Sequence, residues 1–264
     1  MLGKLLKYEW KATARVFVPF YLAVVLFATI NRFFIAMQIT EGWTGLIAGL
    51  SGTAYALAIL ATLALTVFII IQRFYKNLLG DEGYLMFTLP VKTWQNITAK
   101  LLIAAAWVVI STAVVFGSVF IMVAQKGMMA EVSRAIEVVV NELKSINLNI
   151  GVSAALFIVG IVVSLFTGIL FLYASISIGQ LFSRHKLIAS FGAFLGLNIV
   201  SQILSSILLA MTYFVNPQLF IVNNQTTPTF IYIMLIGTLA INLIMGIGYY
   251  IASEQILTKR LNLD

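Results

Sequence analysis

Long apolar stretches separated by short polar segments dominate the chain. A membrane-spanning helix needs about 20 mostly apolar residues, and six stretches reach that length. They are Val16–Met37, Thr44–Ile71, Leu101–Ala124, Ile150–Gly179, Leu187–Val215 and Phe230–Ala252. No internal repeat and no low-complexity linker divides the sequence. The pattern predicts an all-α polytopic membrane protein, with six transmembrane helices in a single domain over residues 1–264.

The composition supports this prediction. Of the 264 residues, 61% are hydrophobic and 9% are charged, whereas about 25% of residues are charged in an ordinary soluble domain. This excludes a disordered tail, a secreted disulfide scaffold and an ordinary soluble enzyme. The absence of cysteine and the single histidine, His185, argue against a cysteine zinc site, a thiol nucleophile or a histidine metal cluster.

The basic residues are unevenly distributed between the predicted loops. Twelve fall on one side of the membrane, in the N-terminal segment, the second-to-third loop, the fourth-to-fifth loop and the C-terminal tail. The other side has four, namely Arg32, Lys126, Arg134 and Lys144. By the positive-inside rule both termini are expected in the cytoplasm. The net charge of +7 is thereby accounted for without a nucleic-acid partner.

Three segments between the spans have a pattern of their own. Residues 1–15 are too charged for a cleaved signal peptide, and the helical spacing of Lys4, Lys7 and Lys11 predicts an interfacial amphipathic helix. Residues 125–149 have an apolar stripe at spacings of 4, 3, 4 and 3, which predicts an extracellular amphipathic helix. We expect that helix to rest on the membrane or the bundle, with a gate or substrate cap as the alternative.

The longest cytoplasmic segment, 73–100, mixes charged and apolar residues. Gly80 and Gly83 flank Asp81 and Glu82, and an apolar cluster follows before Pro90. An exposed apolar cluster of this kind favours docking of a partner protein over a segment folded back on the membrane.

The predicted spans contain almost no ionisable residues, which argues against a transporter coupled to protons or sodium. Asn198, Ser201, Gln202 and Ser205 instead form a polar stripe on the fifth span, and Asn242 lies in the sixth. These residues are expected either to bond neighbouring helices or to line a substrate path, for which Asn198, Gln202 and Asn242 are the candidates. The sequence has no phosphate-binding G-x-x-x-x-G-K-[ST] loop, so energy for transport must come from another chain.

At residues 78–102, LLGDEGYLMFTLPVKTWQNITAKLL, the chain resembles the membrane subunits of bacterial ATP-binding cassette (ABC) exporters of the type 2 permease family. The resemblance lies in Glu82–Gly83, in Leu89–Pro90 and in Lys100 at the start of the third span. It also covers the architecture of nearly the whole chain, from the basic N-terminal segment to the cytoplasmic C-terminus.

The resemblance implies a permease that does not itself hydrolyse ATP. It implies a partner permease subunit, identical or related, and two P-loop ATPase subunits that carry the ATP and magnesium, in a bacterial plasma membrane. The cytoplasmic loop would then contain a coupling helix that docks into the ATPase, and the fourth-to-fifth loop would make a second contact. The implied coupling residues are Asp81, Glu82, Gly83, Tyr84, Phe87, Pro90, Arg184 and Lys186. The expected cargo is amphipathic: a peptide, a lipid-like molecule or a drug.

Two other function classes stay open from the sequence. One is a passive channel or membrane scaffold without energy coupling. The other is a membrane enzyme acting on lipid, for which Glu9, Asp81, Glu82, Arg184 and His185 are the cytoplasmic candidates. His185 lies between two basic residues, so a loop residue is the simpler interpretation.

Overall fold

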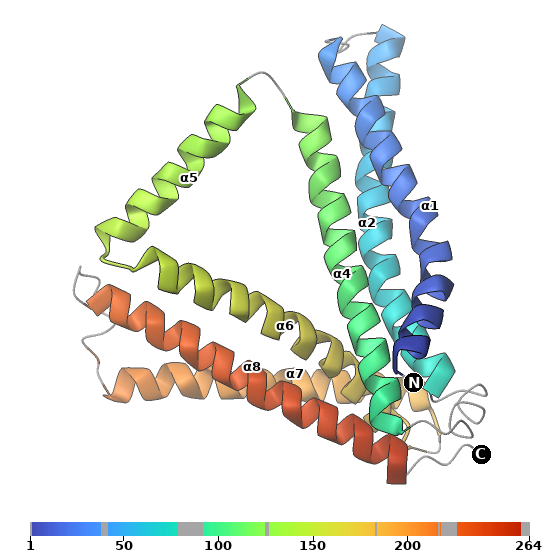
Figure 1. Ribbon diagram of the computed structural model, residues 1–264, viewed down its shortest axis with the longest axis vertical. Helices are drawn as coiled ribbons and strands as arrows, with labels where there is room; N and C mark the ends of the chain where they lie inside the picture. The colour runs from blue at the N-terminus through green and yellow to red at the C-terminus, as the bar shows by residue number, and fades with distance from the viewer. Residues whose placement is uncertain are drawn as a thin grey trace. The chain divides into compact units, whose positions relative to one another are not determined.

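The protein is an all-α polytopic membrane protein, as its sequence predicts (Figure 1). The computed structural model describes residues 2–37, 42–78, 92–124, 127–182, 184–215, 217 and 226–259. Within these residues, six helices are long and apolar enough to cross a membrane, and a seventh, α5, is amphipathic. The helices are α1 (Leu2–Ala36), α2 (Gly42–Leu78), α4 (Thr93–Val123), α5 (Met128–Ser145), α6 (Ile150–Gly179), α7 (Lys186–Val215) and α8 (Thr226–Lys259).

Several helices continue well beyond their apolar stretches. Residues 2–15 are helical and run into the first span without a break, through Pro19, so that α1 has 35 residues. A helix of that length is about 52 Å long, whereas the hydrocarbon core of a bilayer is about 30 Å thick. The charged turns at the start of α1, residues 2–15, therefore extend past the apolar part of a membrane.

The chain divides into two compact units. Unit 1 is Met1–Lys126 and contains α1, α2 and α4, with α1 packed against both of the others. The first residues of α1, the last of α2 and the first of α4 lie at the same end of this unit (Figure 1). The predicted coupling segment, 73–100, includes the last residues of α2 and the first residues of α4. Both of these flanking helix ends therefore lie at that end of unit 1.

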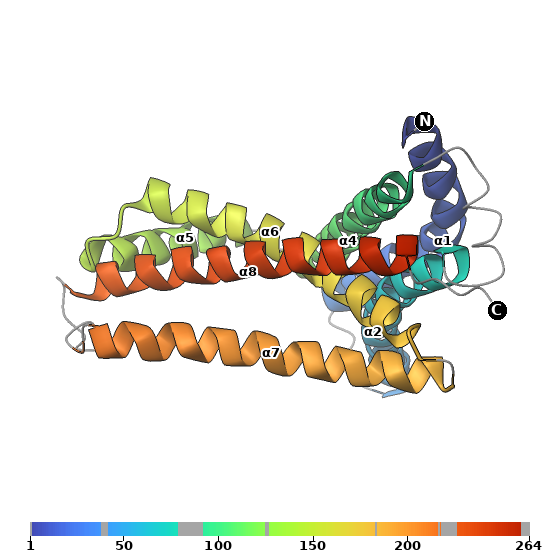
Figure 2. The same cartoon turned by 90° about the horizontal axis from the view of Figure 1, so that it is seen from below.

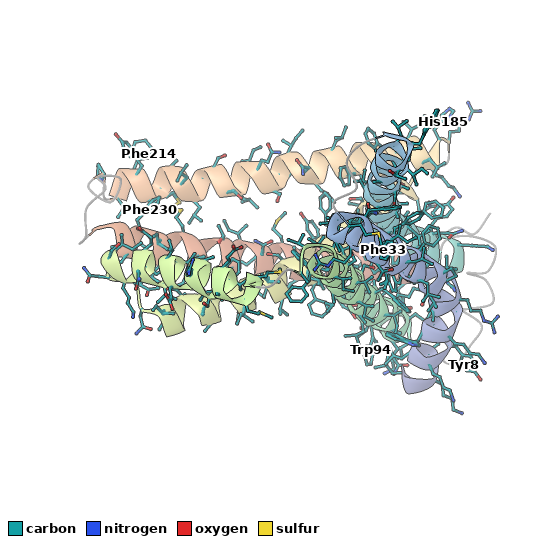
Figure 3. All side chains as sticks on the ribbon, turned by 90° about the horizontal axis from the view of Figure 1, so that it is seen from above. Tyr8, Phe33, Trp94, His185, Phe214 and Phe230 are labelled. Atoms are coloured by element: carbon teal, nitrogen blue, oxygen red, sulfur yellow. The ribbon has the colours of Figure 1, made fainter. Side chains whose placement is uncertain are left out.

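Unit 2 is Gly127–Asp264 and contains α5 to α8, with α6 packed against both α7 and α8 (Figure 2). Phe214 and Phe230 lie together at one end of this unit, and His185 lies at the opposite end of α7 (Figure 3). Small residues allow close contact here. A Cβ at Gly179 would overlap the Oγ of Ser190 and lie 2.5 Å from its Cα and N atoms, so α6 and α7 nearly touch at the short connection between them.

The predicted extracellular helix over 125–149 is present as α5, and its side chains are not buried. None of residues 128–145 is buried, and Ile136, Val138 and Val139 are all more than half exposed. An 18-residue helix with one apolar face and few contacts to the rest of its unit has the character of an interfacial helix. Its side of the membrane stays a prediction.

Candidate functional site

The predicted coupling residues Asp81, Glu82, Gly83, Tyr84, Phe87 and Pro90 lie outside the described residues. Their flanks are described: α2 ends at Leu78 and α4 begins at Thr93. The geometry of these two helix ends determines how the coupling segment is attached to the rest of unit 1.

A group of ionised side chains joins the three helices next to these ends. Lys100 of α4 places its Nζ 2.6 Å from Oε1 of Glu9 on α1, and Nη1 of Arg73 on α2 lies 3.9 Å from Oε2 of the same carboxylate. The Lys100 side chain is 3% exposed, that of Glu9 12% and that of Arg73 30%. An ammonium group this deeply buried needs an anionic partner, because loss of hydration is costly unless the charge is paired. Glu9 therefore fixes α1 and α4 in register.

An aromatic stack continues the attachment of α1 to α4. The ring of Trp107 lies between those of Trp10 and Phe17, with centroids 4.6 and 4.5 Å apart and interplanar angles of 20° and 17°. Trp107 Nε1 donates a 2.7 Å hydrogen bond to Oγ1 of Thr13, whose hydroxyl in turn donates to the Glu9 carbonyl. The three stacked rings and the Trp107–Thr13 hydrogen bond thus stabilise the same register of α1 against α4 as the ion pair.

Further along, hydroxyl groups link the same helices inside the apolar region. The Ser111 hydroxyl of α4 is 2.7 Å from the hydroxyl of Tyr21 and 2.9 Å from that of Thr66, and so joins all three helices. Tyr55 of α2 is hydrogen bonded to Ser118 at 2.9 Å. We call the set from Lys100 to Ser118, with its partners on α1 and α2, the polar seam. It covers 19 residues of α4, from Lys100 to Ser118, which is a rise of about 27 Å.

The polar seam was not predicted from the sequence, although a signal for it is present there. On α4, Lys100, Trp107, Ser111 and Ser118 follow one another at spacings of 7, 4 and 7. On α2, Tyr55, Thr62, Thr66 and Arg73 repeat the same spacings. Residues at these intervals share one helix face, so the same spacing on two helices indicates that the two faces contact each other.

The second predicted contact, around Arg184 and Lys186, is at the α6–α7 connection. Arg184 is exposed and Lys186 is the first residue of α7. His185 has a left-handed backbone with φ of 57°, and its carbonyl accepts the Ala189 amide at 3.0 Å. His185 is exposed too. The described residues contain no group of three His, Asp or Glu side chains that could hold a metal ion.

Two of the three candidate substrate-path residues line one cavity in unit 2. The cavity has a volume of about 230 Å³ and lies among α6, α7 and α8. The polar residues in its wall include Asn198, Asn242, Ser201, Ser205, Thr167 and Tyr249. Apart from the Tyr249 phenol, no lining residue has an acidic or basic side chain. Gln202 is not part of the wall.

The hydrogen bonds of these amides are mostly within their own helices. Gln202 Nε2 donates to Asn198 Oδ1 at 2.7 Å, four residues away on α7. Asn242 Nδ2 donates to the Thr238 carbonyl at 2.9 Å on α8. The bond between helices uses the backbone: Thr167 Oγ1 of α6 donates to the Asn242 carbonyl at 3.0 Å. The cavity therefore presents amide and hydroxyl groups without formal charge, which suits a polar but uncharged part of an amphipathic ligand.

No protein-family model, curated protein or solved structure matches the chain in sequence or fold comparisons.

Proposed function

We propose that this chain is the membrane-spanning permease subunit of an ATP-driven ABC exporter in a bacterial plasma membrane, energised by separate P-loop ATPase subunits. Six membrane-spanning helices are compatible with a transport subunit. The proposal also rests on the sequence resemblance at residues 78–102 and on the absence of a phosphate-binding loop from the sequence.

The observation that carries the proposal is the polar seam. A coupling segment can transmit force only if its two arms are firmly attached to the helices that must move. Here the α2 and α4 arms are joined to α1 by the Glu9–Lys100 pair, the Trp107 stack and the Ser111 hydroxyl. A displacement of the segment by the ATPase would therefore move α1, α2 and α4 as one body.

The cavity in unit 2 is the candidate contact for the transported molecule. Asn198 and Asn242 bring amide groups into a space of about 230 Å³ that also has aromatic and aliphatic walls. An amphipathic peptide, lipid-like molecule or drug matches both kinds of surface.

Coupling is tested by co-expressing the chain with candidate P-loop ATPase subunits from the same genome and purifying the complex from membranes. Tyr84→Ala and Phe87→Ala should each weaken ATPase association about thirtyfold, because a buried aromatic anchor commonly contributes about 2 kcal/mol at an interface. Glu82→Lys should also weaken ATPase association. His185→Ala, an exposed residue of the α6–α7 connection, is the control and should bind and stimulate the ATPase like the unmodified chain.

The substrate path is tested separately with vesicles that export a panel of fluorescent amphipathic peptides and dyes. Asn198→Leu and Asn242→Leu should reduce export and leave ATPase association intact, whereas Ser206→Leu, an exposed α7 position outside the cavity wall, should not. If the Tyr84, Phe87 and Glu82 variants all behave like the unmodified chain, the segment is not the coupling element and a passive channel or scaffold becomes the better assignment.

A further inference from the structure

A second cavity, of about 290 Å³, lies between α1 and α2 in unit 1. Its wall is ordered along α2. Leu65 and Phe68 come first, together with Val16 of α1, and Gln72, Arg73 and Lys76 follow towards the end of the helix. From Leu65 to Lys76 the helix rises about 16 Å. One end of the groove is thus apolar and the other is cationic.

The apolar end is open to the surroundings. Phe68 is 59% exposed and Val16 is 42% exposed. Both belong to helices that are long and apolar enough to span a membrane, so this end of the groove suits the hydrocarbon of a lipid chain.

The cationic end is placed where an anion is favoured. Glu9 provides one carboxylate for both Lys100 and Arg73, and it lies much closer to Lys100, at 2.6 Å, than to Arg73, at 3.9 Å. Over the described residues 2–17, 70–78 and 92–102, eight side chains are basic and Glu9 is the single acidic one. The basic residues are Lys4, Lys7, Lys11, Arg15, Arg73, Lys76, Lys92 and Lys100. Arg73 therefore shares the Glu9 carboxylate with a cation that lies much closer to it.

We propose that this groove binds the headgroup of an anionic phospholipid, with the phosphate held by Gln72, Arg73 and Lys76 and an acyl chain lying along Val16, Leu65 and Phe68. The guanidinium of Arg73 can donate two hydrogen bonds to one phosphate, and Lys76 adds a second positive charge. The order of the wall matches the order of a lipid, with the headgroup at the helix end and the chain towards the membrane centre. Basic pockets between transmembrane helices are known to take such headgroups. The site does not depend on the proposed transport function.

The test uses the full chain purified in a mild detergent, with lipid binding measured by native mass spectrometry. Phosphatidylglycerol should bind more tightly than phosphatidylcholine with the same acyl chains. Each lost cation should raise the Kd for phosphatidylglycerol about fivefold, so that Lys76→Gln gives about fivefold and Arg73→Gln/Lys76→Gln about thirtyfold, with little change for phosphatidylcholine. Phe68→Ala should weaken both lipids.

The matched control is Lys4→Gln/Lys7→Gln, which removes the same charge from exposed positions outside the groove. The proposal is overturned if this control weakens phosphatidylglycerol as much as Arg73→Gln/Lys76→Gln. It is also overturned if glycerol 3-phosphate competes fully at equal concentration, which would indicate a site for free phosphate. A change of oligomeric state in Phe68→Ala with unchanged lipid binding would assign the groove to a second copy of the chain. Lys76→Gln and Phe68→Ala do not remove Arg73 or Lys100, the ion-pair partners of Glu9. These two variants therefore still test the proposal if Arg73→Gln/Lys76→Gln fails to fold.

Discussion

Glu9 and Lys100 are 91 positions apart in the chain, yet their side chains form a 2.6 Å ion pair that is almost completely buried. The pair joins the second turn of α1 to the start of α4. It lies beside the two helix ends from which residues 79–91 emerge, so its integrity bears on both folding and the proposed coupling.

Removing one partner of this pair should be strongly destabilising. Glu9→Gln leaves the Lys100 ammonium buried without its carboxylate, and the expected loss is about 3 kcal/mol of unfolding free energy. The combined variant Glu9→Gln/Lys100→Met should recover much of that loss, because it removes the uncompensated charge. Denaturant unfolding in mixed micelles measures both. Lys11→Gln, at an exposed position of α1, is the control and should change stability by less than about 0.5 kcal/mol. Equal stability of Glu9→Gln and the control would contradict the prediction.

Trp107 has two separable roles, which two substitutions distinguish. Trp107→Phe keeps a ring between Trp10 and Phe17 but loses the Nε1 bond to Thr13, and should cost about 1 kcal/mol. Trp107→Ala also removes the stack and should cost about 3–5 kcal/mol. The near-ultraviolet circular dichroism from the Trp10–Trp107 pair should be lost in both variants. Trp43→Phe, at a position 82% exposed, should leave that signal in place.

Glycines in unit 2 should differ in their tolerance of alanine according to what the new methyl group meets. Gly179→Ala should be the worst, because Ser190 backbone atoms lie 2.5 Å from the Cβ position, and Ser190→Gly should not rescue it. Gly237→Ala meets only the end of the Leu208 side chain, 2.7 Å away, which can move. Gly160→Ala meets nothing within 4 Å and should be neutral or slightly stabilising. Thermal unfolding of the three variants should give this order, and a Gly179→Ala variant as stable as Gly160→Ala would show that α6 and α7 are not in such close contact.

The predicted topology can be tested by cysteine labelling, since the native chain has no cysteine. A cysteine at Ser145 or Thr227 should react with a membrane-impermeant reagent from outside the cell. Cysteines at Thr93 and Thr258 should react only after the membrane is opened. Labelling of Thr93→Cys in intact cells would place the α4 start outside and would remove the basis for a cytoplasmic coupling segment.

The spans could be predicted from the sequence because an apolar run of about 20 residues or more is typical of a membrane-spanning helix and rare elsewhere. Ile150–Gly179 has the same bounds in the prediction and in α6. Residues 1–15 were predicted to be helical, but not to continue into the first span as they do in α1. The predicted second span was shorter than α2, whose last turns include Arg73, Lys76 and Leu78, residues that favour helix even though they are not all apolar. Hydropathy measures transfer into lipid, and so it does not detect where the backbone stops being helical.

Contacts between helices were harder to predict. The periodicity of a helix shows which residues share a face, as it did for Asn198 and Ser201, but not which helix lies opposite. Glu9 pairs with Lys100, and Ser111 with Tyr21 and Thr66, only because of a tertiary register that depends on all the packed side chains. The repeated spacing of 7, 4 and 7 on α2 and α4 indicates a contact between those two helices, but it does not indicate how α1 packs against them.

The exposed side chains of α5 have a consequence for its backbone. A lone helix of 18 residues is only marginally stable in water, and none of its side chains is buried within the described part of the chain. Its amide protons should therefore exchange with deuterium at a rate governed by the lipid or detergent surface around it. Those of α4 should exchange slowly in every medium that preserves the fold.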